Sequence, residues 1–263
     1  MDNQILKVNG LTMDFGGIRA LNSLDLDVNR GEIVALIGPN GAGKTTFFNC
    51  ITGIYAPTEG EVYLASPGSD TKVSLKGLKP NQVTEKGLAR TFQNIRLFAK
   101  MTVLENVMIG RHCRTKATVL GAVFRNRTTR DEEQSILETS YDILEKVGLE
   151  QYVNEFANNL PYGAQRRLEV ARALATEPLL LLLDEPAAGM NPQETIELEK
   201  LIKEISSEGQ SILLIEHDMT LVMSLSDRIF VMDYGKKIAE GTPVEIRENP
   251  AVIKAYLGED VDA

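Results

Sequence analysis

The chain has 263 residues, of which 43% are hydrophobic and 25% are charged. This length allows about three quarters of the unfolded surface to be buried in one large domain or two small ones, and the composition excludes collagen-like, disordered and disulfide-scaffold proteins. The longest aliphatic run, Leu179–Leu183, is much shorter than the roughly 20 residues that a membrane-spanning helix requires. The polar start, Met1 to Gln4, lacks the basic and apolar regions of a signal peptide, so we expect a cytosolic protein.

The charge balance argues against general binding of DNA or RNA. Lys and Arg number 28 against 37 Asp and Glu, which gives a net charge of −9, and phosphate binding depends on clustered cations. The two cysteines, Cys50 and Cys113, are too far apart in sequence to form a metal-binding motif. Two isolated thiols are typical of a reducing compartment, and we expect both to be buried or inert.

Strands come first along the chain and helices alternate with strands at the end. In the first third, short apolar or alternating segments predict strands at 5–8, 24–28, 32–37 and 61–64. The middle has helical spacing from 103 to about 147, interrupted by a basic stretch at 111–130. The last third predicts helices at 163–175 and 192–207 and strands at 179–183, 212–215 and 228–232. This alternation indicates a largely parallel α/β core, and we expect residues 95–160 to form a helical subdomain inserted into one domain, 1–263.

A phosphate-binding motif follows the strand predicted at 32–37. It has the form G-x-x-x-x-G-K-[ST] and consists of Gly38, Pro39, Asn40, Gly41, Ala42, Gly43, Lys44, Thr45 and Thr46. Its glycines allow successive N–H groups to surround an anion, and the following helix directs its positive end at the same phosphates. Lys44 is expected at the β- and γ-phosphates and the Thr45 hydroxyl at Mg²⁺. The alternative, a chance glycine-rich turn, explains neither the strand before the loop nor the helix after it.

Two adjacent acids, Asp184 and Glu185, end the apolar strand predicted at 179–183. Open α/β sheets bind ligands at the carboxyl ends of their strands, so both side chains are expected near the nucleotide. Asp184 is expected to hold Mg²⁺ through water, and Glu185 is a candidate general base for the attacking water. A solvated turn is the alternative, and alone the two acids do not exclude it.

Further segments narrow the class of nucleotide-binding protein. The segment 160–174, with the sequence LPYGAQRRLEVARAL, resembles the signature segment of the ABC ATPases. Gln93 is similar to the glutamine of their Q-loop, His217 to their switch histidine, and residues 189–191 to their D-loop. Phe15 resembles the aromatic residue that stacks on adenine, with a core aromatic as the alternative. These features run in the family's order from Phe15 to His217 and therefore cover most of the chain.

The resemblance implies a P-loop NTPase core with a mixed, largely parallel sheet flanked by helices, an antiparallel β subdomain and an inserted α-helical subdomain. It implies ATP and Mg²⁺ as cofactors, with Gln93 sensing the nucleotide and Mg²⁺. His217 is expected to contact the γ-phosphate, and a structural histidine is the alternative. The signature residues are expected to act in trans on a second ATPase subunit, homologous or identical. The trans residues are Pro161, Tyr162, Gly163 and Ala164.

Within that family the chain most resembles ATP-binding subunits of branched-chain amino acid importers, on segments 90–93, 101–110, 185–192 and 233–243. The resemblance implies transmembrane permease subunits as partners, a solute-binding protein as an indirect partner, and a peripheral position on the inner face of the plasma membrane. Two departures stand out: Pro161-Tyr162 replaces the commoner Ser-Gly, and Asn191 stands where Asp is common. Both departures indicate a weaker site at this subunit's signature face.

Two surfaces remain ambiguous in the sequence. An apolar group beside Gln93 is expected partly in the core and partly against the permease; its residues are Ile95, Leu97, Phe98, Met101 and Val103. A basic stretch is suited equally to anionic headgroups or permease loops and to a solvated surface. Its cations are Arg111, Arg114, Lys116, Arg125, Arg127 and Arg130, and they enclose the apolar segment 119–124.

Two other functions compete with an importer ATPase. The first is a soluble ABC-type clamp on nucleic acid or ribosomes; the acidic charge, the absence of a long coiled-coil insert and the single copy of each motif disfavour it. The second is a GTPase or small-molecule kinase, but the chain lacks an N-K-x-D motif and such enzymes have no counterpart of segment 160–174.

Overall fold

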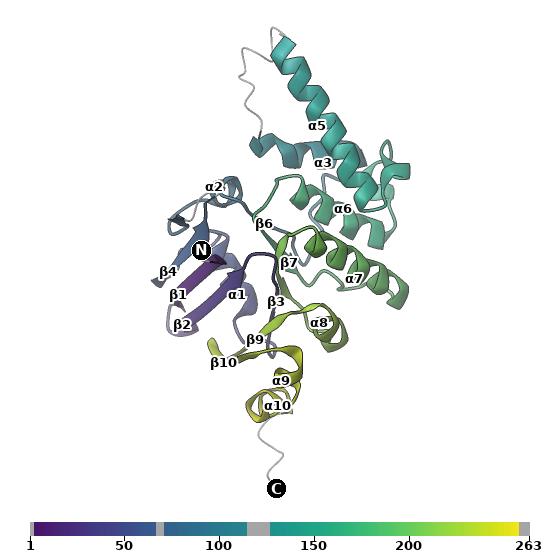
Figure 1. Ribbon diagram of the computed structural model, residues 1–263. Coiled ribbons are helices and arrows are strands. Elements are labelled where there is room, and N and C mark those ends of the chain that lie inside the picture. Colours follow the sequence, from purple (N-terminus) through teal and green to yellow (C-terminus); the bar gives the residue numbers. More distant parts are fainter. Residues whose placement is uncertain (1–2, 67–70, 115–126, 258–263) are drawn as a thin grey trace.

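The computed structural model describes residues 3–66, 71–114 and 127–257, and its strands form two sheets (Figure 1). The smaller sheet is antiparallel with the order β2-β1-β4-β5. Its strands are β1 (Gln4–Phe15), β2 (Ile18–Asn29), β4 (Glu59–Ala65) and β5 (Lys72–Ser74).

The larger sheet has the order β10-β9-β3-β8-β7-β6 and is parallel except for its edge strand β10. Its strands are β3 (Ile33–Ile37), β6 (Leu88–Arg90), β7 (Leu180–Asp184), β8 (Ser211–Ile215), β9 (Arg228–Asp233) and β10 (Lys236–Gly241). The carboxyl ends of β3, β6, β7 and β8 therefore meet along one edge. This edge is where ligands bind in open α/β sheets.

The helices divide into those of the core and those inserted between β6 and β7. The insert contains α3 (Val103–Arg111), α5 (Arg127–Lys146), α6 (Tyr162–Leu174) and the 3₁₀ helices His112–Arg114, Glu150–Tyr152 and Ala157–Asn159. The other helices are α1 (Lys44–Ile51), α2 (Pro80–Glu85), α7 (Pro192–Ser207), α8 (Met219–Leu225), α9 (Pro243–Arg247) and α10 (Pro250–Leu257).

The hydrophobic core lies on both faces of the larger sheet. Along β3, Ile33, Ala35 and Ile37 belong to one buried cluster, whereas Val34 and Leu36 belong to a second cluster shared with α1 and the antiparallel sheet. Successive strand residues point to opposite faces, so a strand covered on both sides is apolar throughout. This pattern confirms the expectation from the sequence that 32–37 is a strand buried on both faces.

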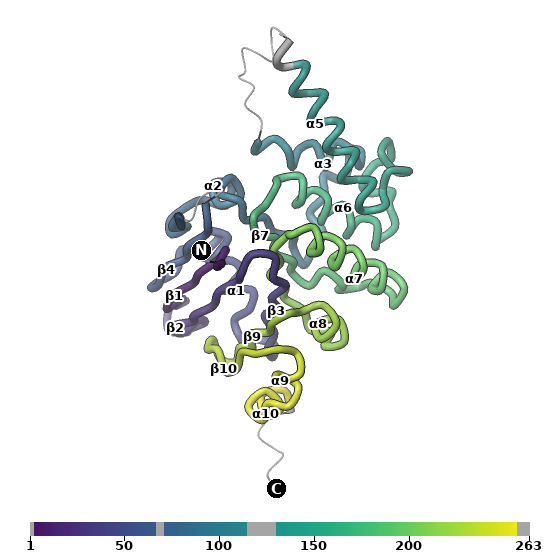
Figure 2. Tube along the Cα trace, viewed as in Figure 1, coloured from purple at the N-terminus to yellow at the C-terminus, as the bar shows by residue number. Residues whose placement is uncertain are grey.

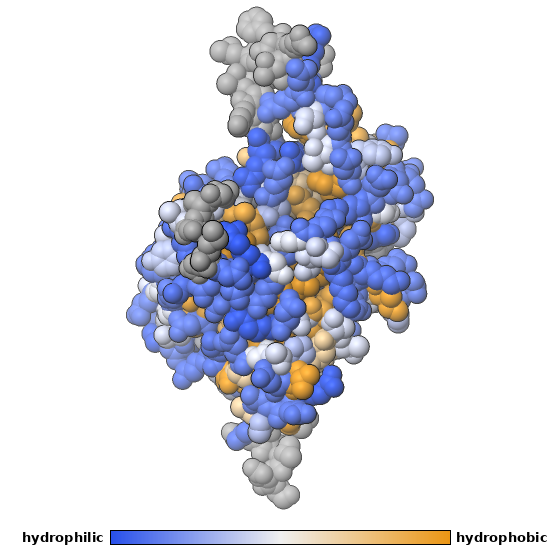
Figure 3. All heavy atoms as spheres, in the orientation of Figure 1, coloured by the Kyte–Doolittle hydropathy of each residue, from blue (hydrophilic) through white to orange (hydrophobic). Residues whose placement is uncertain are grey.

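The molecule is elongated. Helices α3 and α5 extend from one end, and α9 and α10 lie at the other, beyond the sheets (Figures 1 and 2). The face visible in Figure 3 is mostly hydrophilic, with hydrophobic side chains gathered in a discontinuous band down its middle. None of the helices among the described residues is long and apolar enough to cross a bilayer.

The predicted fold class is confirmed, but several boundaries differ from those expected. Strands β1 and β2 each have 12 residues, longer than predicted, because register shifts let the pair continue through polar positions. Strands β5 and β6 have three residues each and β10 is a polar edge strand, so none of them gives a periodic signal. The helical insert continues through α6 to Leu174, past the predicted limit at 160.

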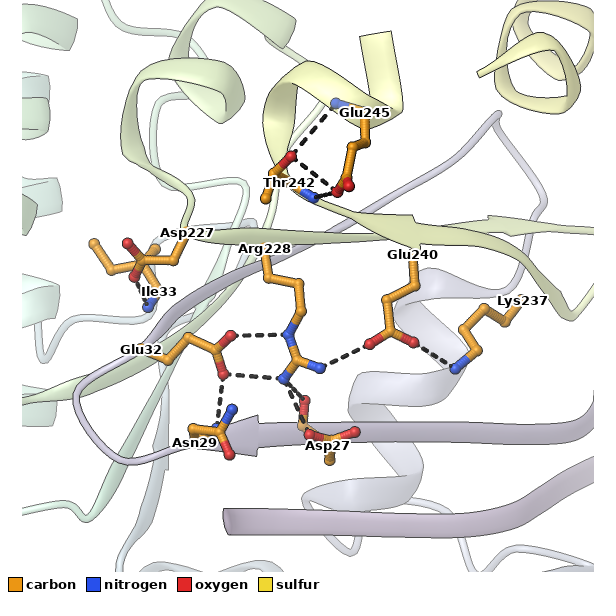
Figure 4. A network of polar contacts seen from close by, with 10 residues as sticks. All are labelled: Asp27, Asn29, Glu32, Ile33, Asp227, Arg228, Lys237, Glu240, Thr242 and Glu245. Atoms are coloured by element: carbon orange, nitrogen blue, oxygen red, sulfur yellow. Dashed lines mark hydrogen bonds and ion pairs between the residues drawn. The ribbon is translucent and has the colours of Figure 1, made fainter. Parts of the chain in front are cut away.

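A partly buried ionic network joins the two sheets (Figure 4). Arg228, at the start of β9, donates hydrogen bonds to Glu32 at 2.8 and 3.0 Å, to Asp27 at 3.0 Å and to Glu240 at 2.7 Å. Its side chain is 20% exposed. The network therefore connects β2, the residue before β3, β9 and β10 through one guanidinium group.

Candidate functional site

The phosphate loop follows β3 in the predicted place. Gly41 and Gly43 have φ of +81° and +103°, a region that favours glycine. A Cβ on Gly43 would lie 2.7 Å from the carbonyl oxygen of Ala20, so the close approach of the chain also requires glycine. Gly43 is the N-cap of α1 and provides no side-chain cap, which leaves the first N–H groups of the helix for an anion.

Side chains of the loop differ in their exposure. Asn40, Gly41 and Thr45 are exposed, Pro39, Gly43, Lys44 and Thr46 are half-buried, and Gly38 and Ala42 are buried. The Lys44 ammonium donates to the carbonyl oxygens of Gly38 at 2.6 Å and Pro39 at 3.0 Å, so it lies over the loop. Burial lowers the pKa of Lys44, and the Glu185 charge opposes this shift.

The Asp184 carboxylate lies at the end of β7 and is buried. Its Oδ2 accepts a hydrogen bond from Arg90 Nη2 at 2.7 Å, and its backbone N–H donates to Thr91 Oγ1 at 3.3 Å. Arg90 belongs to segment 90–93, on which the family resemblance rests, but the sequence predicted no role for its side chain.

Glu185 follows Asp184 with φ of +47°, in the left-handed region. Its Oε2 accepts a hydrogen bond from Gln93 Nε2 at 2.7 Å and lies 3.8 Å from His217 Nδ1. The His217 side chain is 66% exposed, which disfavours the structural alternative for this residue. The fold therefore brings together three predicted site residues from three separate loops.

A buried glutamate, Glu216, orders the loops around that group. Its Oε1 accepts from the backbone N–H of Ala187 at 2.9 Å and its Oε2 from that of His217 at 3.1 Å. Burial raises the pKa of Glu216, and the N–H groups of Ala187, His217 and Asp218 partly offset this rise. Glu216 precedes the predicted histidine, but its role depends on a loop 29 residues away and the sequence did not reveal it.

The signature segment begins α6, with Pro161 as its N-cap. The Tyr162 hydroxyl donates to the carbonyl oxygen of Ala188 at 2.7 Å and accepts from Arg166. Arg166 is buried and also donates to the backbone carbonyls of Phe92 and Gln93. Gly163 and Ala164 are buried, and a Cβ on Gly163 would lie 2.6 Å from Glu194 Oε1.

The second departure, Asn191, has a local explanation. It is the N-cap of α7, and its Oδ1 accepts from the backbone N–H groups of Gln193 at 2.9 Å and Glu194 at 3.0 Å. Glu194 Oε2 accepts in turn from the N–H of Asn191, which completes a capping box. Asn serves this cap as well as Asp does.

Two aromatic residues from opposite ends of the chain are Phe15 and Tyr256. Phe15 ends β1 and is 41% exposed, with its ring in edge contact with Tyr55 at a centroid distance of 5.3 Å, so it is not a core aromatic. At the other end of the chain, burial raises the pKa of Tyr256 of α10, and the N–H of Gly38 partly offsets this rise.

The structure also describes part of the two surfaces whose role is ambiguous in the sequence. Val103 is fully buried and Leu97 packs against the core, whereas Phe98 is 47% exposed, so the apolar group is divided between the core and the surface. In the basic stretch, Arg111 pairs with Glu177, and Arg114 donates to the carbonyl oxygens of Glu85, Thr176 and Glu177. Lys116, Arg125 and segment 119–124 lie outside the described residues, as does the side chain of Arg127; Arg130 is exposed.

Comparisons with known proteins settle the family. The family model described as ABC transporter matches residues 21–188, and one described as Branched-chain amino acid ATP-binding cassette transporter matches residues 236–262. The chain belongs to the ABC transporter family. It is 49% identical over 260 residues to the High-affinity branched-chain amino acid transport ATP-binding protein LivG of Salmonella typhimurium, with 98% of this chain and 100% of the relative covered. BraF of Pseudomonas aeruginosa, which has the same description, is 48% identical over 98% of this chain and 100% of its own length.

Solved structures agree with this assignment. The ADP conformation of an ATP-binding cassette of an ABC transporter superimposes with a TM-score of 0.82 at 32% identity, covering 97% of this chain and 99% of that one. A dimeric post-hydrolysis ATP-binding cassette bound to ADP and Pi has a TM-score of 0.73 at 26% identity, with coverage of 90% and 98%. The ABC ATPase fold predicted from the sequence is confirmed.

Proposed function

We propose that this chain, as one ABC-type domain over residues 1–263, is the ATP-hydrolysing subunit of an importer for branched-chain amino acids. The observation that carries the proposal is the convergence of Gln93, Glu185 and His217 at the sheet edge beside the phosphate loop. The transport function of relatives 48–49% identical over nearly the whole chain supports the importer assignment. Transport relatives give no support to the alternative of a nucleic-acid or ribosome clamp.

The phosphate loop would hold the nucleotide, with Lys44 turning from Gly38 and Pro39 toward the phosphates and Phe15 against the adenine. The donors available to Mg²⁺ are the Thr45 hydroxyl, an Asp184 oxygen and the Gln93 amide oxygen. Such hard oxygen donors fit Mg²⁺, which keeps several waters and needs few protein ligands. The described residues contain no cluster of three His, Cys, Asp or Glu suited to a metal. When bound, the ion would neutralise phosphate charge.

For hydrolysis, Glu185 would accept the proton of the attacking water. Gln93 donates a hydrogen bond to Oε2 of Glu185, and His217 Nδ1 lies 3.8 Å from the same oxygen. Both side chains would hold the Glu185 carboxylate in place, and His217 would also contact the γ-phosphate.

A complete site would need a second ATPase subunit, identical or homologous. The residues Pro161, Tyr162, Gly163 and Ala164 begin α6, and the N–H groups at that helix end would cap the γ-phosphate of the partner's nucleotide. The dimeric relative bound to ADP and Pi supports this arrangement. ATP would favour the closed pair and hydrolysis the open one, because the γ-phosphate is the bridge.

The permease would dock beside the Q-loop. A groove of about 420 Å³ lies between α2, α3 and α6, and Phe98, Ile109 and Arg172 line it. Exposed apolar side chains beside a half-buried arginine are typical of a protein interface. The chain would thus sit on the inner face of the plasma membrane through its permease, with the solute-binding protein as an indirect partner.

The variant Glu185→Gln tests the proposal. An amide cannot accept the proton, so turnover should fall by about 10²–10⁴, equivalent to roughly 3–5 kcal/mol of barrier, while ATP affinity is retained. Steady-state phosphate release and nucleotide titration measure the two effects. Glu204→Gln, on the exposed face of α7, is the control and should match the native protein. Near-native hydrolysis by Glu185→Gln would remove Glu185 from the role of base.

A further inference from the structure

Arg90 occupies an unusual position for a charged residue, at the end of β6 and almost completely buried. Its side chain is 6% exposed and that of its partner Asp184 is 4% exposed, with 2.7 Å between Nη2 and Oδ2. We propose that Arg90 is a positioning residue that fixes the Asp184 carboxylate for Mg²⁺-nucleotide binding. This inference rests on the proposed ATPase function, which places Asp184 at the metal.

Arg90 binds two elements of the site at once. While Nη2 holds Asp184 of β7, Nη1 donates to Asn49 Oδ1 at 2.7 Å and to Thr52 Oγ1 at 3.4 Å, both at the end of α1 or just after it. Since α1 begins at Lys44, the guanidinium connects the helix of the phosphate loop to the carboxylate expected at the metal. A rotation of the carboxylate would break this connection.

Aromatic rings hold the guanidinium in its plane. Its central carbon lies 5.4 Å from the ring centroid of Phe48, in α1, and 5.1 Å from that of Phe92, next to Gln93. Arg90 therefore contacts the base of the Q-loop as well. Only a planar group can stack on rings while its two arms bind different acceptors, so lysine would replace it incompletely.

The pairing also determines which carboxylate oxygen is available. Oδ2 is occupied by Arg90, and among the described residues no hydrogen bond to Oδ1 is found, so Oδ1 is the oxygen free for a metal-bound water. Among residues 3–66, 71–114 and 127–257, no hydrogen-bond partner is found for the buried Arg90 Nε, so this ion pair is not optimised for stability. Buried ion pairs often contribute no more stability than apolar residues, which favours a functional reason for this one.

The test compares the affinity for a non-hydrolysable ATP analogue with Mg²⁺ and with EDTA, measured by calorimetry on the full chain. The ratio of the two affinities isolates the metal-dependent part of binding. Loss of a residue that orients a metal ligand typically costs about 10–100-fold in metal affinity, so Arg90→Met should lower the ratio at least tenfold and leave affinity in EDTA unchanged. Arg90→Lys should give an intermediate ratio.

Two controls separate positioning from folding. Arg228→Lys weakens a different, partly buried arginine network, at the opposite ends of the strands from the phosphate loop, and should lower the melting temperature without altering the ratio. In the background of Asp184→Asn, Arg90→Met should have no further effect on the ratio, because Arg90 acts through the Asp184 carboxylate.

The outcomes are distinct. An unchanged ratio in Arg90→Met, a parallel loss of affinity in Mg²⁺ and EDTA, or an additive effect in the double variant would overturn the inference. If Arg90→Met does not fold, a native ratio in Arg90→Lys would overturn it and an intermediate ratio would support it. A native protein that binds no nucleotide would instead reject the proposed function.

Discussion

Replacing Arg228 by Met removes the cation that joins the two sheets (Figure 4). Burial alone would lower the pKa of Arg228, but its hydrogen bonds to Glu32 and Asp27 raise it overall, so the guanidinium remains charged. In Arg228→Met the three carboxylates lose this cation at sites that are only 14–31% exposed. Glu240 keeps Lys237 as a partner, whereas Glu32 and Asp27 are left facing each other's charge.

The size of the loss follows from this exposure. Breaking a fully buried pair costs about 3–5 kcal/mol and an exposed pair about 0–1 kcal/mol, so a partly buried network should lose roughly 2–3 kcal/mol. At about 2–4 °C per kcal/mol for a chain of this size, the melting temperature should fall by about 4–12 °C. Arg228→Lys keeps the charge but not the three-way geometry, and its fall should be smaller.

Circular dichroism melts at fixed nucleotide concentration measure the effect. Arg19→Met, which removes a surface pair with Asp14 in which Arg19 is 50% exposed, is the matched control and should leave the melting temperature unchanged. Equal melting temperatures for Arg228→Met and the native protein would refute the reasoning that this network stabilises the contact between the sheets.

Three further predictions concern single residues. Gly43→Ala places a Cβ 2.7 Å from the carbonyl oxygen of Ala20 at a φ of +103°, so it should cost about 1–3 kcal/mol of stability and weaken ATP binding; urea unfolding and nucleotide titration measure both, and native values would contradict the close approach. Burial raises the pKa of Cys50 to about 11, so at pH 8 only about one thiol in a thousand is ionised and a disulfide reagent should label Cys50 only slowly until the protein is unfolded; rapid labelling of native protein would be inconsistent with this. Tyr162→Phe removes the hydrogen bond to Ala188 and should lower the free energy of unfolding by about 1 kcal/mol, and an unchanged urea midpoint would argue against that contact.

The sequence predicts this fold well where one signal dominates. Two signals mark where strands end: two acids follow the apolar segment at β7, and the glycine pattern follows β3. Burial and backbone geometry leave few alternative positions for these strand ends. The three-residue strands β5 and β6 have no such signal, since their pairing is decided by long-range neighbours. In β5 and β6, tertiary contacts override the intrinsic secondary-structure preference of the residues.

The candidate site shows the same division between residues expected to contact the nucleotide and residues that hold those side chains in place. Gln93, Glu185 and His217 are recognisable because their chemistry is tied to short motifs. Arg90 and Glu216 are not, because each acts through a residue distant in sequence: Arg90 through Asp184, 94 positions away, and Glu216 through Ala187, 29 positions away. No periodicity or spacing predicts such a pair.

Tyr162 illustrates what the structure adds to a departure seen in sequence. With Pro161 in place of the commoner Ser, the segment lacks one hydroxyl expected to contact the partner's γ-phosphate; Tyr162, in place of Gly, has a hydroxyl that donates to Ala188 of its own chain. The cap on the partner's nucleotide would then depend on the backbone N–H groups at the start of α6, which need no particular side chain. Because Arg166 connects the same tyrosine to the carbonyls of Phe92 and Gln93, a shift of the Q-loop would move the start of α6 with it. Tyr162 therefore gives the start of α6 a mechanical connection to the Q-loop within the subunit, and the weaker signature face stays a prediction.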